Sequence, residues 1–326
     1  MAARPNMLDN LTDLEIIQRY RFDRRGIEYL EDLLRPYLQP RTARHQSLSV
    51  REKILIALRY FATGGVQLND GDIHHVSQST VSKAVNKVVT ALCTPALIQQ
   101  FVSFPTQVAD LDKQAQQFYG TARFPKAVGV IDGTHIKILA PSEEEDIFVN
   151  RKGYHSINVQ VVFDAFDRIE DIVARWPGST HDSRILHNSG LRQLFERGIV
   201  HGGYHLLGDS GYPCRRWLLT PYLNPQPGAQ SAYNRAHKIT RSKVERGIGQ
   251  LKRRFGILHG EIRMKPEKAC RVITACAVLH NICKQRDIPL PDVDNEDQDD
   301  QPQNAIDPNA PQVGLRYRDY IANTYF

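Results

Sequence analysis

Apolar residues recur at helical spacing through the N-terminal third of the chain. Two segments open with a capping box, in which a Ser or Thr side chain and a Glu three residues later each bond the other's backbone N–H: Thr12/Glu15 and Ser49/Glu52. The second segment continues with a helical apolar stripe, formed by Ile54, Leu55, Leu58, Phe61 and Ala62. This pattern predicts an all-helical N-terminal domain over residues 1–102.

A further helix is predicted from Ser77, a candidate N-cap, to Leu92. One of its faces is apolar and consists of Val81, Ala84, Val85, Val88 and Leu92. Its opening turn instead offers small hydrogen-bonding groups and a cation to solvent: Gln78, Ser79, Thr80, Ser82 and Lys83. Such a turn is typical of the helix that a helix-turn-helix inserts into the major groove of DNA. We therefore interpret residues 49–92 as a helix-turn-helix; the alternative is an ordinary packed helix pair.

From residue 127 the pattern changes to short apolar runs typical of strands. The runs AVGVIDGTHIKIL, HSINVQVVFDAF and IEDIVARWPG precede a helical segment and a fourth strand-like run, YHLLGDSGYP. Three successive strands, a helix and a further strand predict a mixed α/β domain over residues 127–288, with helices packed on its sheet. Residues 103–126 are expected to form a linker or connecting helix between the two domains.

Two long helical segments complete the predicted α/β domain. The first, TRSKVERGIGQLKRRFGIL, follows an irregular Pro- and Gly-rich connection and carries the apolar stripe Val244, Ile248, Leu251 and Phe255. The second, EKACRVITACAVLHNICKQ, places Cys276, His280 and Cys283 on one face. These three side chains lack a fourth ligand and share their face with apolar residues, so core packing is favoured over a zinc site.

The C-terminal residues differ in composition from the rest of the chain. Residues 289–314 are acidic and rich in Pro, Asn and Gln, which predicts a disordered tail, and residues 315–326 are expected to form a short helix. The formal net charge is +6, and residues 288–300 contribute −6 to it, which leaves +12 for the rest of the chain. A body this basic favours phosphate-bearing partners, with solubility alone as the alternative.

Composition also bears on the class of protein and its compartment. No segment approaches the ~20 apolar residues that span a bilayer, and the N-terminus MAARPNMLDN has no apolar signal-peptide core. The five cysteines form no CxxC pair and are odd in number, which favours a reducing compartment. A membrane or secreted protein is therefore not expected.

Three carboxylates stand in apolar surroundings in three different segments. Asp132 interrupts the first strand-like run, Asp209 ends the fourth, and Glu245 borders the apolar stripe of the first long helix. A buried carboxylate costs several kcal/mol unless a cation meets it. Two strand carboxylates and one helix carboxylate suit hard cations such as Mg²⁺ or Mn²⁺, and two such ions serve phosphoryl displacement.

Eight segments carry a family resemblance: LTDLEIIQRYRF, VSQSTVSKAV, GVIDGTHIKI, NRKGYHSINVQ, WPGSTHDS, LLGDSGYP, KVERGIGQLKRRFGIL and AVLHNIC. In this order and spacing they resemble the PIF/Harbinger transposases over nearly the whole chain. Only the acidic stretch 291–312 has no strong counterpart. The resemblance implies a ribonuclease H-like fold whose DDE catalytic triad maps onto Asp132, Asp209 and Glu245, with two Mg²⁺ or Mn²⁺ ions per site.

The resemblance also implies an activity and partners. The expected protein is a metal-dependent endonuclease that cuts duplex DNA at element ends and joins the freed 3′-hydroxyl to target DNA. It is expected to need a Myb/SANT-type DNA-binding partner, to oligomerise on DNA, and to act in the nucleus while staying cytoplasmic without that partner.

Other acidic residues admit simpler interpretations. Asp182, in STHDS, either supports the metal site or caps the helix that follows, and the residues leave both alternatives open. The acidic residues around the turn between the second and third strands are expected to be solvated: Asp164, Asp167, Glu170 and Asp171.

Several cations lie near the triad in the sequence and could hold DNA phosphates: Lys137, Arg151, Lys152, Arg241, Lys243, Lys252, Arg253 and Arg254. The alternative for each is a solvated surface position.

Three alternatives to an active transposase stay open. A domesticated nuclease without transposition would keep the same residues. A non-catalytic DNA-binding regulator would use the helix-turn-helix alone, but the three carboxylates argue against it because charge in apolar surroundings is costly. A phosphatase acting on small substrates fits poorly with the basic surplus and the helical N-terminal domain.

Overall fold

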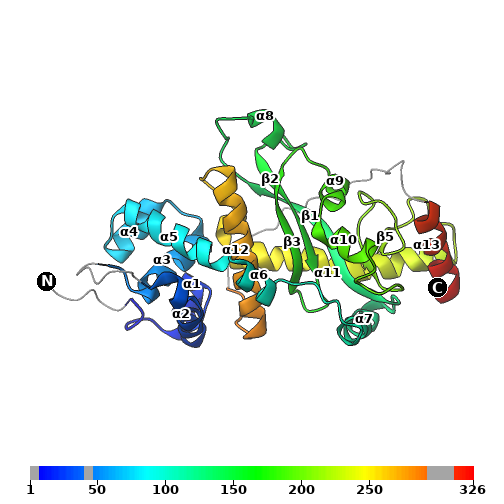
Figure 1. Cartoon of the computed structure of the whole chain (residues 1–326), viewed down its shortest axis with the longest axis horizontal. Helices are drawn as coiled ribbons and strands as arrows, with labels where there is room; N and C mark the ends of the chain where they lie inside the picture. The colour runs from blue at the N-terminus through cyan, green and yellow to red at the C-terminus, as the bar shows by residue number, and fades with distance from the viewer. Residues whose placement is uncertain (1–6, 40–46, 292–311) are drawn as a thin grey trace. The chain divides into compact units, whose positions relative to one another are not determined.

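The part of the chain that the structure describes contains many helices and a five-stranded mixed sheet (Figure 1), so the predicted mixed α/β class is confirmed. The computed structural model describes residues 7–39, 47–291 and 312–326. The chain divides into two compact units. Unit 1 comprises residues 1–101, 136–139 and 250–296, and unit 2 comprises residues 102–135, 140–249 and 297–326.

Unit 1 is helical, as the apolar spacing predicted. Its N-terminal helices are α1 (Asp13–Tyr20), α2 (Arg24–Leu38), α3 (Val50–Thr63), α4 (Gln67–His74), α5 (Gln78–Leu92) and α6 (Pro95–Phe101). Both predicted capping boxes are present, at the starts of α1 and α3. The Ser77 side chain caps α5 by accepting the backbone N–H of Thr80 at 3.3 Å. The apolar faces of α3 and α5 are buried against each other.

A late helix, α12 (Pro266–Gln285), belongs to the same unit and packs on α5 and α6. Cys276, His280 and Cys283 are fully buried in this helix, so the predicted core packing is confirmed. The compact units therefore cut across the predicted functional domains, because α12 was assigned to the α/β domain. The predicted boundaries describe functional domains and not compact units, so they stay predictions.

Asp70 of α4 is buried, with 3% of its surface exposed, and burial raises its pKa to about 6 although Arg59 opposes the shift. In the unfolded chain the pKa is 3.8, so the folded protein binds this proton more tightly and loses stability as pH rises from about 4 to about 6. Asp70→Asn is therefore expected to raise the free energy of unfolding at neutral pH by about 1–2 kcal/mol, after allowance for solvent screening.

Chemical denaturation of wild type and Asp70→Asn in acidic and neutral buffers measures this difference. The gain is expected to shrink as the pH falls and to vanish at about pH 3, where Asp70 is neutral in the folded and mostly so in the unfolded protein. An equal gain at both pH values would contradict the assignment of the effect to this ionisation.

Unit 2 contains the sheet, whose strand order is β3-β2-β1-β4-β5. The strands are β1 (Ala127–Lys137), β2 (Ser156–Phe163), β3 (Ile169–Pro177), β4 (His205–Leu207) and β5 (Leu218–Leu219). β2 and β3 pair antiparallel, whereas β1, β4 and β5 are parallel to one another. The central position of β1 buries its apolar residues on both faces, which explains why its sequence reads as a continuous apolar run.

Helices cover both faces of this sheet. On one face, α7 (Val108–Ala122), α9 (Asp182–His187) and α10 (Gly190–Glu196) pack over an apolar cluster that includes Ile131 and Val162. Because neighbouring strand residues point to opposite faces, Asp132 and Phe163 face the other side. There α11 (Ala229–Arg254) crosses the sheet so closely that a Cβ on Gly247 would lie 2.7 Å from the Phe163 ring.

The structure corrects some predicted boundaries and leaves others outside its range. α11 begins at Ala229 within the segment expected to be irregular, and β5 was not predicted. The C-terminal helix is confirmed as α13 (Gln312–Tyr325), which belongs to unit 2 and whose Asp319 Oδ1 accepts a 2.6 Å hydrogen bond from Tyr222 Oη. Most of the acidic tail, residues 292–311, lies outside the described residues.

Among residues 7–39, 47–291 and 312–326, no single helix is long and apolar enough to cross a membrane, although α5 and α6 meet the length and composition test as a bent pair.

Candidate active site

Two of the three predicted carboxylates lie at the same level of neighbouring strands. β1 and β4 run parallel with Val130 opposite Leu207, and each of these residues is followed two positions later by an aspartate, Asp132 or Asp209. Asp209 is 5% exposed and its Oδ1 accepts the backbone N–H of Gly211 at 3.0 Å. The sheet register therefore brings together two carboxylates that are far apart in the sequence.

The third carboxylate is joined to the first by an arginine. Arg241 and Glu245 lie one turn apart on α11, which covers the face of the sheet toward which Asp132 points. The Arg241 guanidinium donates to Asp132 Oδ2 at 2.8 Å and to Glu245 Oε1 at 2.5 Å. A single guanidinium thus bridges Asp132 and Glu245.

Burial and neighbouring charge disfavour ionisation of Asp132. Burial is the largest cause that raises its pKa, to about 7, while Arg241 acts in the opposite direction and Asp209 and Asp182 raise it further. Its Oδ1 also accepts the backbone N–H of Gly133 at 2.9 Å. One arginine does not fully compensate this concentration of negative charge, which is a condition that a divalent cation would relieve.

Asp182 belongs to this group of carboxylates and does not cap α9. It is the first residue of the helix, after the N-cap His181, and it is 7% exposed. Its Oδ1 accepts a hydrogen bond from Asn158 Nδ2 at 2.8 Å and lies against Gly133, where a Cβ would be 2.4 Å away. Burial raises the pKa of Asp182. Of the two alternatives left open by the sequence, capping is therefore not seen, and support of a metal site by Asp182 stays a prediction.

The donor set suits a hard cation, but its members are not gathered into a finished metal site. Within the described part of the chain, no three His, Cys, Asp or Glu side chains are grouped as metal ligands. The reason is visible in the geometry, since the Arg241 guanidinium stands between Asp132 and Glu245. Carboxylate oxygens on two strands and one helix match the ligand preference of Mg²⁺ and Mn²⁺.

Comparison with known proteins bears on the family to which this chain belongs. The family described as DDE superfamily endonuclease matches residues 131–281, a range that contains all three carboxylates. The chain is also 39% identical over 278 residues to the candidate nuclease HARBI1 of Mus musculus, covering 84% of this chain and 79% of that protein. This chain belongs to the DDE superfamily endonucleases.

Other relatives of this DDE endonuclease are more distant. HARBI1 of Xenopus laevis is 36% identical over 286 residues, covering 87% of this chain and 82% of that protein. The Arabidopsis thaliana protein named antagonist of like heterochromatin protein 1 is 30% identical over 267 residues, covering 74% of this chain and 66% of its own length. No solved structure matches the chain. Membership of the DDE endonucleases implies the ribonuclease H-like fold.

The candidate DNA contacts of the endonuclease divide by their exposure. On α5, Gln78, Ser79, Ser82 and Lys83 are exposed and Thr80 is half-buried. Lys137, Arg151 and Lys152 are exposed, and the Arg151 charge lowers the pKa of Asp182, which indicates that Arg151 is near the carboxylates. Contact between these residues and DNA stays a prediction.

The remaining candidate cations serve packing in part or in whole. Arg254 is wrong as a DNA contact, because it is 1% exposed and its guanidinium donates to the carbonyl oxygens of Ile288 and Pro289. Lys243 donates to the Ala165 carbonyl at 3.0 Å, and Arg253 donates to the Pro291 carbonyl at 3.2 Å. Lys252 is half-buried.

The expectation that the acidic residues of the β2–β3 turn are solvated was wrong. Asp164 is fully buried and pairs with Arg168 at 2.6 Å, and Asp167 is 5% exposed and pairs with Arg246 of α11 at 2.6 Å. Glu170 is also buried, and burial raises the pKa of both Glu170 and Asp171, the latter to about 6. Folding of the turn toward the sheet and α11 therefore buries charges that a sequence turn pattern places in water.

Sequence reasoning missed the functions of two polar residues in the site. Arg241 was expected to contact DNA, whereas it bridges two triad carboxylates, and no sequence signal distinguishes these uses of an arginine. Asn158, which orients Asp182, could have been found because it is a polar residue within the buried strand β2.

Proposed function

We propose that this DDE endonuclease is the catalytic subunit of a PIF/Harbinger-type DNA transposase, which cuts at element ends and joins the freed 3′-hydroxyl to target DNA. The observation that carries the proposal is the register of β1 and β4. It puts Asp132 and Asp209 side by side beneath the helix that bears Glu245. Similarity to HARBI1 supports nuclease activity in particular.

Asp132, Asp209 and Glu245 would hold Mg²⁺ or Mn²⁺ ions, two per site, with Asp182 supporting from beside Gly133. Bound divalent ions supply activation of the attacking water or 3′-hydroxyl and stabilisation of the leaving oxygen in an in-line phosphoryl displacement. Before metal binds, Arg241 neutralises part of the carboxylate charge. Its release would free Glu245 to bind metal together with Asp132 and Asp209. Once released, its guanidinium would suit a phosphate oxygen of the substrate.

The exposed first turn of α5 supports DNA recognition by a helix-turn-helix, because Gln78, Ser79 and Ser82 offer donors and acceptors there. We further propose a Myb/SANT-type partner that recognises the element ends, assembly of two or more copies on DNA so that both ends are cut together, and action in the nucleus. These proposals extend the PIF/Harbinger resemblance of the sequence.

A second candidate is a domesticated nuclease that cuts DNA without transposing. The likeness to HARBI1, a protein named as a candidate nuclease, over 84% of this chain favours it. A non-catalytic regulator is less well supported, although one relative is named as an antagonist of a heterochromatin protein, because this chain keeps all three carboxylates.

Incubation of the purified protein with labelled duplex DNA, in Mg²⁺ or Mn²⁺ and in EDTA, tests the proposed function. Metal-dependent cleavage that EDTA prevents is the expected result, and joining of cut ends to a plasmid in the presence of the partner would distinguish a transposase from a domesticated nuclease. Absence of cleavage with cognate ends, partner and metal all supplied would refute the nuclease.

A further inference from the structure

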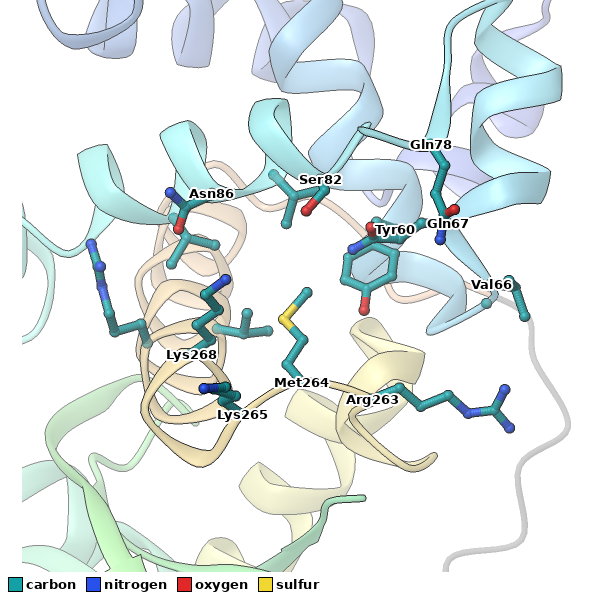
Figure 2. Close-up of a pocket in the computed structure, with 15 residues that line it drawn as sticks. Tyr60, Val66, Gln67, Gln78, Ser82, Asn86, Arg263, Met264, Lys265 and Lys268 are labelled. Carbon is teal, nitrogen blue, oxygen red and sulfur yellow. The ribbon is translucent and has the colours of Figure 1, made fainter. Parts of the chain in front are cut away.

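A groove of about 380 Å³ runs beside α5 within unit 1. Figure 2 shows α5 on one side of the groove and the start of α12, with the segment before it, on the other. Val85, Val89 and Val272 contribute apolar surface to the lining, together with Met264. All of the lining residues belong to unit 1, so the groove is a feature of one compact body.

Cations dominate one wall of this groove. Arg263, Lys265, Lys268 and Arg271 line it, and no Asp or Glu is among its lining residues. Arg271 donates to the Thr90 hydroxyl at 2.8 Å, and Arg263 has a weak contact with Glu261 at 3.7 Å. The ammonium groups of Lys265 and Lys268 are exposed and have no partner among the residues that the structure describes. This wall therefore carries positive charge that is largely uncompensated.

The opposite wall, formed by α5, is uncharged and carries polar side chains beside Val85 and Val89. Gln78, Ser82 and Asn86 follow one another at four-residue spacing along α5 and line the groove. In Figure 2 Asn86 and Ser82 lie along α5, and the Lys268 side chain points toward them from α12. A cationic wall facing amide and hydroxyl groups is the combination of side chains that contacts phosphate oxygens in protein–DNA complexes.

We infer that the groove receives the phosphodiester backbone of one DNA strand while α5 lies in the adjoining major groove. This inference rests on the proposed function and extends it to a site that includes Asn86, Arg263, Lys265, Lys268 and Arg271. The major groove is bounded by two backbones, so a helix inserted into it has a strand alongside. The cationic wall stands beside α5 where that strand would run.

The position of α12 in unit 1 gives this arrangement its rigidity. α12 packs on α5, and Arg271 bonds Thr90 while its carbonyl accepts the Cys93 thiol at 3.2 Å. The base-reading helix and the phosphate-binding wall are thereby held at a fixed separation. Phosphate contacts of this kind set the register of a protein on the duplex without reading its sequence.

The test is binding of a fluorescently labelled duplex to the full chain in EDTA, followed by anisotropy over a range of KCl concentrations. The logarithm of the association constant K falls linearly with the logarithm of the salt concentration, and each lost phosphate contact makes this slope smaller in magnitude by about 0.9. Lys265→Ala/Lys268→Ala is therefore expected to reduce the slope by about 1.8 and to weaken binding at least about tenfold near 0.1 M salt. Lys265→Arg/Lys268→Arg is expected to keep the wild-type slope.

Arg25→Ala/Lys113→Ala is the matched control, since it removes two exposed cations that do not line the groove. A control that lowers the slope as much as the groove variant, or a groove variant that binds like wild type, would overturn the inference. Tighter binding of wild type to a single strand than to the duplex would also overturn the inference. Because EDTA removes divalent metal, this assay measures binding apart from catalysis. If wild type cleaves DNA in a separate assay with metal while the groove variant binds like wild type, the inference fails and the proposed function stands.

Discussion

Replacing Asp132 with Asn is expected to abolish metal-dependent cleavage of duplex DNA by this protein. The substitution keeps the size of the side chain but removes a charged oxygen from the cluster of carboxylates at the site. A bound metal contributes several kcal/mol of transition-state stabilisation, so its loss should lower the cleavage rate by about three orders of magnitude or more. Gel separation of labelled fragments over time, in Mg²⁺ and in Mn²⁺, measures the rate.

The same variant should fold normally, because Arg241 keeps Glu245 as a partner and removal of the unfavourably buried Asp132 carboxylate offsets the loss of the Asp132–Arg241 ion pair. Its midpoint of thermal unfolding in EDTA should be at least that of wild type, and its affinity for duplex DNA should be retained. Asp110→Asn, which changes an exposed carboxylate of α7, is the control and should cleave normally. Cleavage by Asp132→Asn at the wild-type rate would rule out Asp132 as a metal ligand.

Replacing Arg241 with Gln is expected to destabilise the metal-free protein and to increase its response to metal. The variant leaves Asp132 and Glu245 without the guanidinium that joins them. Loss of one partner of a largely buried ion pair should cost about 1–3 kcal/mol, because protonation of Asp132 relieves part of the cost. Since a divalent ion would no longer compete with Arg241, Mg²⁺ or Mn²⁺ should raise the melting temperature more in the variant than in wild type.

Arg246→Gln provides the comparison for Arg241→Gln. Arg246 lies on the same helix and also pairs with a buried carboxylate, that of Asp167, but Asp167 is outside the triad. Its loss should lower stability without changing the shift in melting temperature that metal produces. If metal raises the melting temperature of Arg241→Gln no more than that of wild type or Arg246→Gln, then Arg241 does not occupy the position of a metal ion.

Much of the local structure could be predicted because its causes are local. The Thr12/Glu15 and Ser49/Glu52 boxes and the Ser77 cap act within one helical turn, and each forms as expected. Alternation along β1 likewise sets Asp132 on the face opposite Ile131. The start of α11 at Ala229 was missed because packing against the sheet outweighs the weak helical tendency of the segment before Thr240.

The sequence by itself determined the family of this protein, its class of fold and the three carboxylates that stand against apolar neighbours. Only the tertiary structure decided what surrounds them. It made Arg241 a bridge between Asp132 and Glu245, and it brought Lys268 beside α5 across a long stretch of sequence. The physical reason is that a charge is recognisable in a sequence, whereas its partner is chosen by the packing of elements that are distant along the chain.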